Sequence, residues 1–305
     1  MSNAEPSWGV ILLGHGSQRG ASPRECACAW QQPAPDDTGQ SNDGGSIADL
    51  PGWPVWCRQC PSTPQGLGEV AGRLQARLGE EQAQVILSCL EFIEPFPDEA
   101  VRMLSQQGRN RVVVLPYLLG NGKHATVEMD EMLDEVRAQS PEVELVLADG
   151  LGSDPRLADL IVERIEDMGD AAPIPGNGQL VGIMLVKAGT RTQYDDCLWL
   201  AELGQMVEVR MGEGYAVDVA QSHYGDPTME FAASRLIVER GVTSLICVPY
   251  IFFPGLILTR NVVGTLNRLQ ETYPTVKMTV APPLGVDDRL IEVAVDRVHQ
   301  AWGER

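Results

Sequence analysis

The apolar positions of this chain fall into short β-branched runs separated by longer stretches with helical spacing. A short apolar run predicts a buried strand, and apolar residues three and four positions apart predict an amphipathic helix. In order, the first part of the chain predicts strand 8–14, helix 66–78, strand 84–90, helix 96–107, strand 112–117, helix 125–138, strand 143–147 and helix 155–168. This alternation indicates parallel strands joined by right-handed crossovers.

One of these stretches, 112–126, occurs a second time at 245–259. Both copies are a β-branched run that ends in Pro-Tyr, followed by a glycine-containing loop and an amphipathic helix. An alignment without gaps pairs Pro116 with Pro249, Tyr117 with Tyr250, Gly122 with Gly255 and Thr126 with Thr259. Two further pairs of stretches correspond: 10–17 with 180–190, and 88–95 with 220–227. The chain is therefore a tandem duplication.

We predict an α/β protein with two doubly wound domains, 1–170 and 178–305, each containing a mainly parallel sheet. The segment 169–178, rich in glycine and proline, is the expected linker. A length of 305 residues suits two domains of about 120–150 residues. From about 20 to 65 the helical and strand periodicity is lost and proline is frequent, which indicates a surface insertion.

The net charge, the length of the apolar runs and the residues before the first strand argue against several classes of protein. The net charge of −19 argues against a surface that binds nucleic acid. The longest apolar run, 245–258, is short for a membrane span and is interrupted by Pro249 and Pro254. The residues before the first strand show no pattern of a secretory signal. We therefore expect a soluble, cytoplasmic protein that does not bind membranes.

Three side chains capable of metal and proton chemistry follow predicted strands in the first half: His15, Glu91 and His124. The carboxyl ends of parallel strands share one edge of a sheet, so these residues are expected to converge. Two imidazoles and a carboxylate are suitable ligands for a divalent first-row metal, and they can also accept protons near neutral pH. At the equivalent positions the second half has Ala188, His223 and Ile257, so we expect one active site.

Each of these residues also has a structural interpretation. A histidine in a glycine-rich turn can be an ordinary loop residue, and Glu91 can cap the helix that follows Pro95. The occurrence of all three at equivalent strand ends, in one half only, favours a functional site. His223 either reaches the ligand or a second ion, or has a structural role.

Four cysteines lie together in the insertion: Cys26, Cys28, Cys57 and Cys60. A Cys-x-x-Cys pair in a reducing compartment favours a thiolate metal site over a disulfide. Four thiolates suit either Zn²⁺ or an iron–sulfur cluster, and the spacing does not distinguish these two. The alternative is that the thiols bind nothing. Cys89, Cys197 and Cys247 have apolar neighbours and are expected to be small buried residues.

The sequence also resembles a known family through three ordered motifs. These are Leu12-Leu13-Gly14-His15-Gly16-Ser17, Cys89-Leu90-Glu91-Phe92-Ile93-Glu94-Pro95, and Pro116-Tyr117-Leu118-Leu119-Gly120-Asn121-Gly122-Lys123-His124. They resemble the signature of the class II tetrapyrrole chelatases, the CbiX/SirB sirohydrochlorin chelatases. The resemblance covers 8–14, 66–168 and 180–301, so both halves are expected to be chelatase-like domains.

This resemblance implies a sirohydrochlorin cobalto- or ferrochelatase, a lyase that inserts Co²⁺ or Fe²⁺ into sirohydrochlorin for cobalamin or siroheme biosynthesis. By the same resemblance, His15 and His124 hold the metal and accept pyrrole protons, and Glu91 assists. The second half would supply what a partner subunit gives to short homologues, so a monomer is expected. The alternative is a non-catalytic carrier or sensor that binds metal or tetrapyrrole.

Sirohydrochlorin carries many carboxylates, which a net charge of −19 would repel. Local cations must therefore compensate at the edge where the strands end. The candidate substrate-binding residues are Ser17, Arg19, Lys123, Lys187, Arg191 and Arg260. All five cations are expected on loops or at helix starts, and the alternative for each is an ordinary solvated surface cation.

Overall fold

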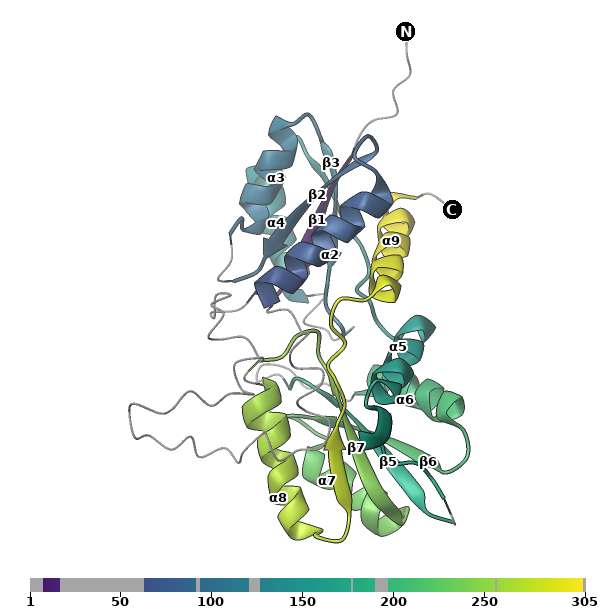
Figure 1. Cartoon of the computed structure of the whole chain (residues 1–305). Helices are drawn as coiled ribbons and strands as arrows, with labels where there is room; N and C mark the ends of the chain where they lie inside the picture. The colour runs from purple at the N-terminus through teal and green to yellow at the C-terminus, as the bar shows by residue number, and fades with distance from the viewer. Residues whose placement is uncertain are drawn as a thin grey trace, which may run out of the picture. The chain divides into compact units, whose positions relative to one another are not determined.

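The computed structural model describes residues 8–16, 63–91, 94–120, 127–176, 178–189, 197–255 and 257–303. The chain forms two compact units (Figure 1). Among the described residues, the first unit contains 8–16, 63–154 and 286–303, and the second contains the residues from 155 to 285.

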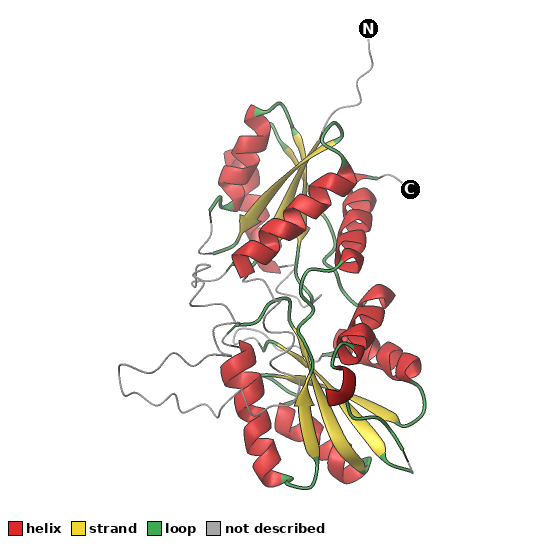
Figure 2. Cartoon of the chain, viewed as in Figure 1, coloured by secondary structure: helices red, strands yellow, loops and turns green. Residues whose placement is uncertain are grey.

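The first unit is built on a sheet of four parallel strands in the order β2-β1-β3-β4. The strands are β1 (Trp8–Gly14), β2 (Ala83–Cys89), β3 (Arg111–Pro116) and β4 (Glu144–Leu147). Every residue of β1 is buried, because the strand is central and both faces of the sheet are covered. The covering helices are α2 (Thr63–Leu78), α3 (Pro97–Gln106), α4 (Val127–Gln139) and α9 (Asp288–Trp302) (Figure 2).

The second unit repeats this arrangement with parallel strands in the order β6-β5-β7-β8. Its strands are β5 (Leu180–Lys187), β6 (Tyr215–Gln221), β7 (Val242–Tyr250) and β8 (Lys277–Val280). Its helical segments are α5 (Pro155–Glu166), η4 (Gly169–Ala171), α6 (Leu198–Met211), α7 (Met229–Ser234) with η5 (Arg235–Glu239), and η6 (Ile257–Val263) with α8 (Gly264–Thr272). The two sheets confirm the predicted fold class of two tandem, doubly wound parallel domains.

The units exchange one helix each. Helix α5 directly follows the strands of the first unit in sequence, but it packs against α6 and β7 of the second unit. Helix α9 is the last helix of the chain, and it packs against α2, β3 and β4 of the first unit. The domain bounds 1–170 and 178–305 follow the sequence repeat and stay a prediction. The compact units differ from these bounds in the placement of α5 and α9.

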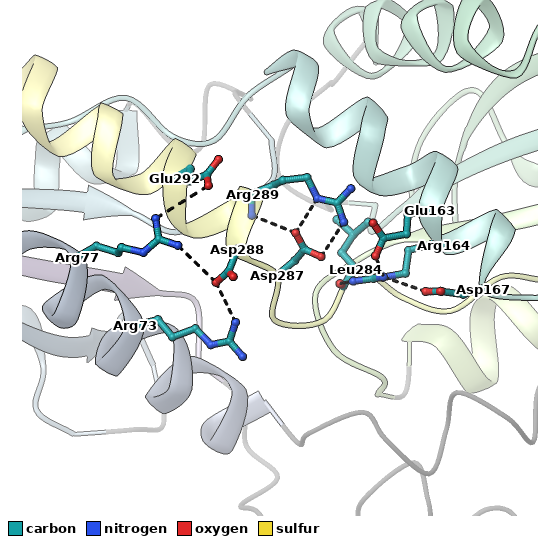
Figure 3. A network of polar contacts seen from close by, with 10 residues as sticks. All are labelled: Arg73, Arg77, Glu163, Arg164, Asp167, Leu284, Asp287, Asp288, Arg289 and Glu292. Carbon is teal, nitrogen blue, oxygen red and sulfur yellow. Dashed lines mark hydrogen bonds and ion pairs between the residues drawn. The ribbon is translucent and has the colours of Figure 1, made fainter.

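Aromatic and ionic contacts hold α9 to the first unit. The indole of Trp302 stacks on that of Trp8, with 4.5 Å between ring centroids, and the Arg111 guanidinium lies 4.0 Å from the centroid of Trp302. At the start of α9, the Asp288 carboxylate accepts a hydrogen bond from Arg73 of α2 at 3.0 Å (Figure 3). α9 is distant in sequence from the other elements of the first unit, so these noncovalent contacts attach it there.

A separate set of contacts shapes the end of the second unit. The Arg164 guanidinium on α5 donates two hydrogen bonds to the carbonyl oxygen of Leu284, at 3.2 and 3.0 Å (Figure 3). Only 13% of the Arg164 side chain is exposed, so this pairing is shielded from solvent.

Within the described ranges, no helix has the length and apolar character needed to cross a membrane.

Candidate metal site at the edge of the first sheet

The structure brings His15 and Glu91 together through their backbones. The paired region of β1 and β2 ends at Gly14 and Cys89. The hydrogen-bond ladder continues past this point, because Leu90 N donates to Gly14 O at 3.0 Å and Glu91 N donates to His15 O at 3.2 Å. Both His15 and Glu91 are exposed, so their side chains are accessible at the carboxyl edge of the sheet.

Gly16 permits this close approach. Its backbone has φ of +89°, a conformation that favours glycine, and a Cβ atom at this position would lie 1.9 Å from the Glu91 carbonyl oxygen. A side chain at residue 16 would therefore push apart the two segments that carry His15 and Glu91. The sequence motif contains this glycine because of steric contact with a residue far away in the chain.

The third predicted strand end lies on the other side of β1 from β2, next to the end of β1. β3 pairs with β1 up to Leu13 and Pro116, and the next residue, Tyr117, donates its N–H to Leu13 O at 2.8 Å. His124 itself lies outside the described residues, as do Ser17, Arg19, Lys123 and Arg191. Their predicted roles in metal and substrate binding stay predictions. The cysteines Cys26, Cys28, Cys57 and Cys60 are also outside the described residues.

Cys89 is the one thiol at this edge among the residues described. Its side chain is buried, and burial raises the pKa of the Cys89 thiol. The thiol therefore stays protonated near neutral pH, and it is poorly suited to be a metal ligand, which must be a thiolate. Cys89, Cys197 and Cys247 are all buried, as predicted.

The second unit preserves the backbone of this edge but has different side chains. Ser222 N donates to Lys187 O at 2.9 Å, just as Leu90 N donates to Gly14 O. A Cβ atom on Gly189 would lie 1.4 Å from the His223 carbonyl oxygen, which matches the contact between Gly16 and Glu91. His223 thus occupies the position of Glu91. Over the described ranges, no cluster of three or more His, Cys, Asp or Glu residues could hold a metal ion in either unit.

Two of the predicted substrate-binding cations are described. Lys187 was expected on a loop but is the last residue of β5, where it is 6% exposed. The strand extends one residue further than its apolar run and so includes Lys187. The ammonium group donates to Ala188 O at 3.1 Å and to Gln221 Oε1 at 3.2 Å. Arg260 is exposed on η6, near the position expected for it.

Solved structures with a similar fold include chelatases. SirB from Bacillus subtilis, solved with Fe³⁺, superposes with a TM-score of 0.65 at 16% identity, and the match covers 97% of this chain and 95% of that one. DR2241 from Deinococcus radiodurans, a multi-domain protein with structural similarity to chelatases, has a TM-score of 0.57 at 15% identity, covering 96% of this chain and 55% of that one. At these identities the likeness establishes the fold.

Sequence relatives and a family model agree with this fold. The sirohydrochlorin ferrochelatase of Priestia megaterium is 22% identical over 210 residues, which are 68% of this chain and 74% of that protein. The sirohydrochlorin cobaltochelatase of Saccharolobus islandicus is 33% identical over 84 residues, which are 26% of this chain and 66% of that protein. The CbiX family model matches 61–168 and 182–301, more than half of the chain and once in each repeat. The resemblance described from the motifs is thus confirmed, and the protein belongs to the CbiX family.

Proposed function

We propose that this protein is a sirohydrochlorin chelatase that inserts a divalent metal, Co²⁺ or Fe²⁺, into the tetrapyrrole. The observation that carries the proposal is the contact between the backbones of His15 and Glu91 at the carboxyl edge of one sheet. The equivalent edge of the second unit has Ala188 and His223 instead, so only the first unit has this combination of side chains. The relatives named as sirohydrochlorin chelatases support the choice of substrate.

The chemistry requires three operations, and the side chains at this edge suit the first two. Water must be removed from the metal ion, two N–H protons must leave the macrocycle, and the ring must be held with its nitrogens toward the metal. His15 and, by the family motif, His124 would replace water on the metal. An imidazole that has released the metal to the ring has its lone pair free and can accept a pyrrole proton, and the exposed Glu91 carboxylate can pass a proton to solvent. The metal is a substrate of this reaction and leaves with the product.

The charge of the substrate sets a further requirement. Its carboxylates are repelled by a net charge of −19, so cations must be concentrated where it binds. Arg260 is exposed on η6 and is a candidate for this role. Lys187 is buried and its ammonium group already donates to Ala188 O and Gln221 Oε1, so we assign it a smaller contribution than Arg260.

We further propose a monomeric, cytoplasmic enzyme of cobalamin or siroheme biosynthesis. The two repeats in one chain support the monomer, since a single chain already contains two chelatase-like sheets. A carrier or sensor that binds metal and ring without turnover is the alternative from another class.

An anaerobic assay with sirohydrochlorin and Co²⁺, Fe²⁺ or Ni²⁺ distinguishes these functions. The enzyme should accelerate the change in the ring's absorbance spectrum at substoichiometric concentration and through many turnovers. A carrier would bind one equivalent and leave the insertion rate unchanged, which would contradict the proposal.

A further inference from the structure

The loop that follows β6 displays an aromatic ring in a conformation that side chains rarely adopt. Tyr224 has φ of +60°, and it and Cys197 are the non-glycine residues with positive φ in the described part of the chain. This region of φ is costly for a bulky residue and is retained mainly where the surroundings or function require it. Yet the side chain is 57% exposed, so burial of its ring in a core does not account for the conformation.

The ring of Tyr224 contacts the imidazole of the preceding residue. The His223 imidazole meets it in an edge-to-face arrangement, with centroids 4.4 Å apart and an interplanar angle of 61°. Nδ1 of His223 is 2.6 Å from Oγ of Ser222, and Ser222 is itself buried at 8% exposure. The backbone beneath is fixed by the hydrogen bond from Ser222 N to Lys187 O and by the contact between Gly189 and His223 O. The aromatic pair is therefore a rigid feature of this edge.

The pair lines a cavity of about 490 Å³ within the second unit. The wall formed by α8 contributes Thr265 and Arg268, and the Arg268 guanidinium donates to Thr265 Oγ1 at 2.8 Å. Arg268 also contacts Glu230 at 3.4 Å, but both side chains are more than half exposed, so this ion pair is weak and can be exchanged for another anion. An aromatic side chain that is more than half exposed and lines the same cavity as a guanidinium suits a flat conjugated ring with carboxylates at its periphery.

We propose that Tyr224, supported by His223, is a stacking platform for the face of a tetrapyrrole, with Arg268 placed to pair with a peripheral carboxylate. The identification of the ring as sirohydrochlorin rests on the proposed function. The platform lies in the second repeat, whose sheet edge does not have the combination of His15 and Glu91. It gives that repeat a direct role in binding the organic substrate, in contrast to a purely structural one.

Three variants test the platform. Tyr224→Gly removes the ring and also relieves the positive φ, Tyr224→Phe keeps the ring, and Phe231→Ala removes a comparably exposed ring, 55% accessible, from α7. Binding of metal-free sirohydrochlorin would be followed by quenching of tryptophan fluorescence, and thermal unfolding would be measured in parallel. Tyr224→Gly should weaken ring binding by about 2–10-fold. It should leave the Tm unchanged or higher, because glycine adopts positive φ without cost.

Tyr224→Phe should bind the ring within about twofold of the parent protein, and Phe231→Ala should be unchanged. In turnover, Tyr224→Gly should raise KM and leave kcat nearly constant, since a stacking contact is present before and during insertion. Parent-like ring binding by Tyr224→Gly would overturn the platform, as would a loss of binding that accompanies a lower Tm. If the parent protein binds the ring through Tyr224 but does not insert metal, the platform stands and the chelatase function fails.

Discussion

The backbone N–H of Glu91 donates to the carbonyl oxygen of His15 at 3.2 Å, just beyond the last paired residues of β1 and β2. This contact uses main-chain atoms only. The separation of the two backbones that carry the functional groups is therefore set by the sheet and does not depend on their side chains. Substitution of either side chain should remove chemistry while leaving the geometry of the edge intact.

His15→Ala should reduce the insertion rate by about 10²–10⁴-fold, the usual range for loss of an acid–base group. Its stability should stay within about 0.5 kcal/mol of the parent protein, because His15 is exposed. His124→Ala should have a similar effect, and Glu91→Gln should be less severe. Initial rates with Co²⁺ and urea unfolding curves measure the two quantities. His299→Gln, at a histidine on α9, is the matched control. Near-parental turnover in the His15→Ala, His124→Ala double variant would refute the site.

Gly16→Ala and Gly189→Ala form a pair of variants that separates the steric effect of an added Cβ atom from the loss of metal binding. Both place a Cβ atom against a carbonyl oxygen, of Glu91 and of His223 respectively, so both should destabilise their own unit. Only Gly16→Ala should weaken Co²⁺ binding in the absence of tetrapyrrole, because only its edge has His15 and Glu91. Calorimetric titration with Co²⁺ gives the affinity. Equal loss of metal affinity in the two variants would show that both edges contribute ligands.

Trp302→Ala tests the attachment of α9 to the first unit. The change removes the stack on Trp8 and the contact with Arg111, and it should lower the free energy of unfolding by at least ~1 kcal/mol. Trp302→Phe should retain most of the stability. Urea denaturation followed by circular dichroism measures both. An unchanged midpoint for Trp302→Ala would mean that the remaining contacts of α9 are sufficient.

Asp218→Asn tests a buried carboxylate on β6. Burial raises the pKa of Asp218 above 3.8, although Arg235 pairs with it at 3.2 Å and opposes the shift. A raised pKa means that the folded state favours the protonated form. This contribution to stability is complete below about pH 3.8 and is lost as the pH rises through the folded-state pKa. Asp218→Asn should therefore raise the Tm at pH 7, and the difference should shrink toward pH 3. A lower Tm for the variant at pH 7 would show that the ion pair with Arg235 outweighs burial.

The four cysteines of the insertion give an independent prediction. Protein purified anaerobically should contain zinc or show a broad brown absorbance, and Cys57→Ser with Cys60→Ser should remove it. Metal analysis and absorbance spectra provide the measurement. Colourless, zinc-free protein with four readily alkylated thiols would exclude this site without affecting the chelatase proposal.

The sequence is sufficient to predict the strands and their order along the chain, because buried parallel strands are short, continuous apolar runs. β1 begins and ends at the predicted residues, Trp8 and Gly14, and β2 is displaced by one residue from the predicted 84–90. The proximity of His15 and Glu91 followed from the same logic, since residues after adjacent parallel strands must lie at one edge. Their catalytic role stays a prediction.

Other features could not be obtained from periodicity. The apolar faces of α5 and α9 indicate that both helices pack against a sheet. The spacing of the apolar residues does not identify which of the two sheets each helix covers. The sequence predicts a loop position for Lys187 because it follows an apolar run, whereas pairing with Gln221 and Tyr250 extends β5 to include it. Tyr224 had no distinguishing pattern, because its positive φ arises from the path of the loop. Such features depend on contacts between distant segments.

The exchange of α5 and α9 has a consequence for synthesis on the ribosome. The strands of the first unit are complete by Leu147, but α9, which covers part of its sheet, is made about 140 residues later. At elongation rates of ~5–20 residues per second, that interval is roughly 7–30 seconds. During it, the apolar surface destined for α9 must stay exposed or be shielded by a chaperone. The second unit receives α5 before its own strands are made, so its helices and strands are synthesised in one continuous stretch of the chain.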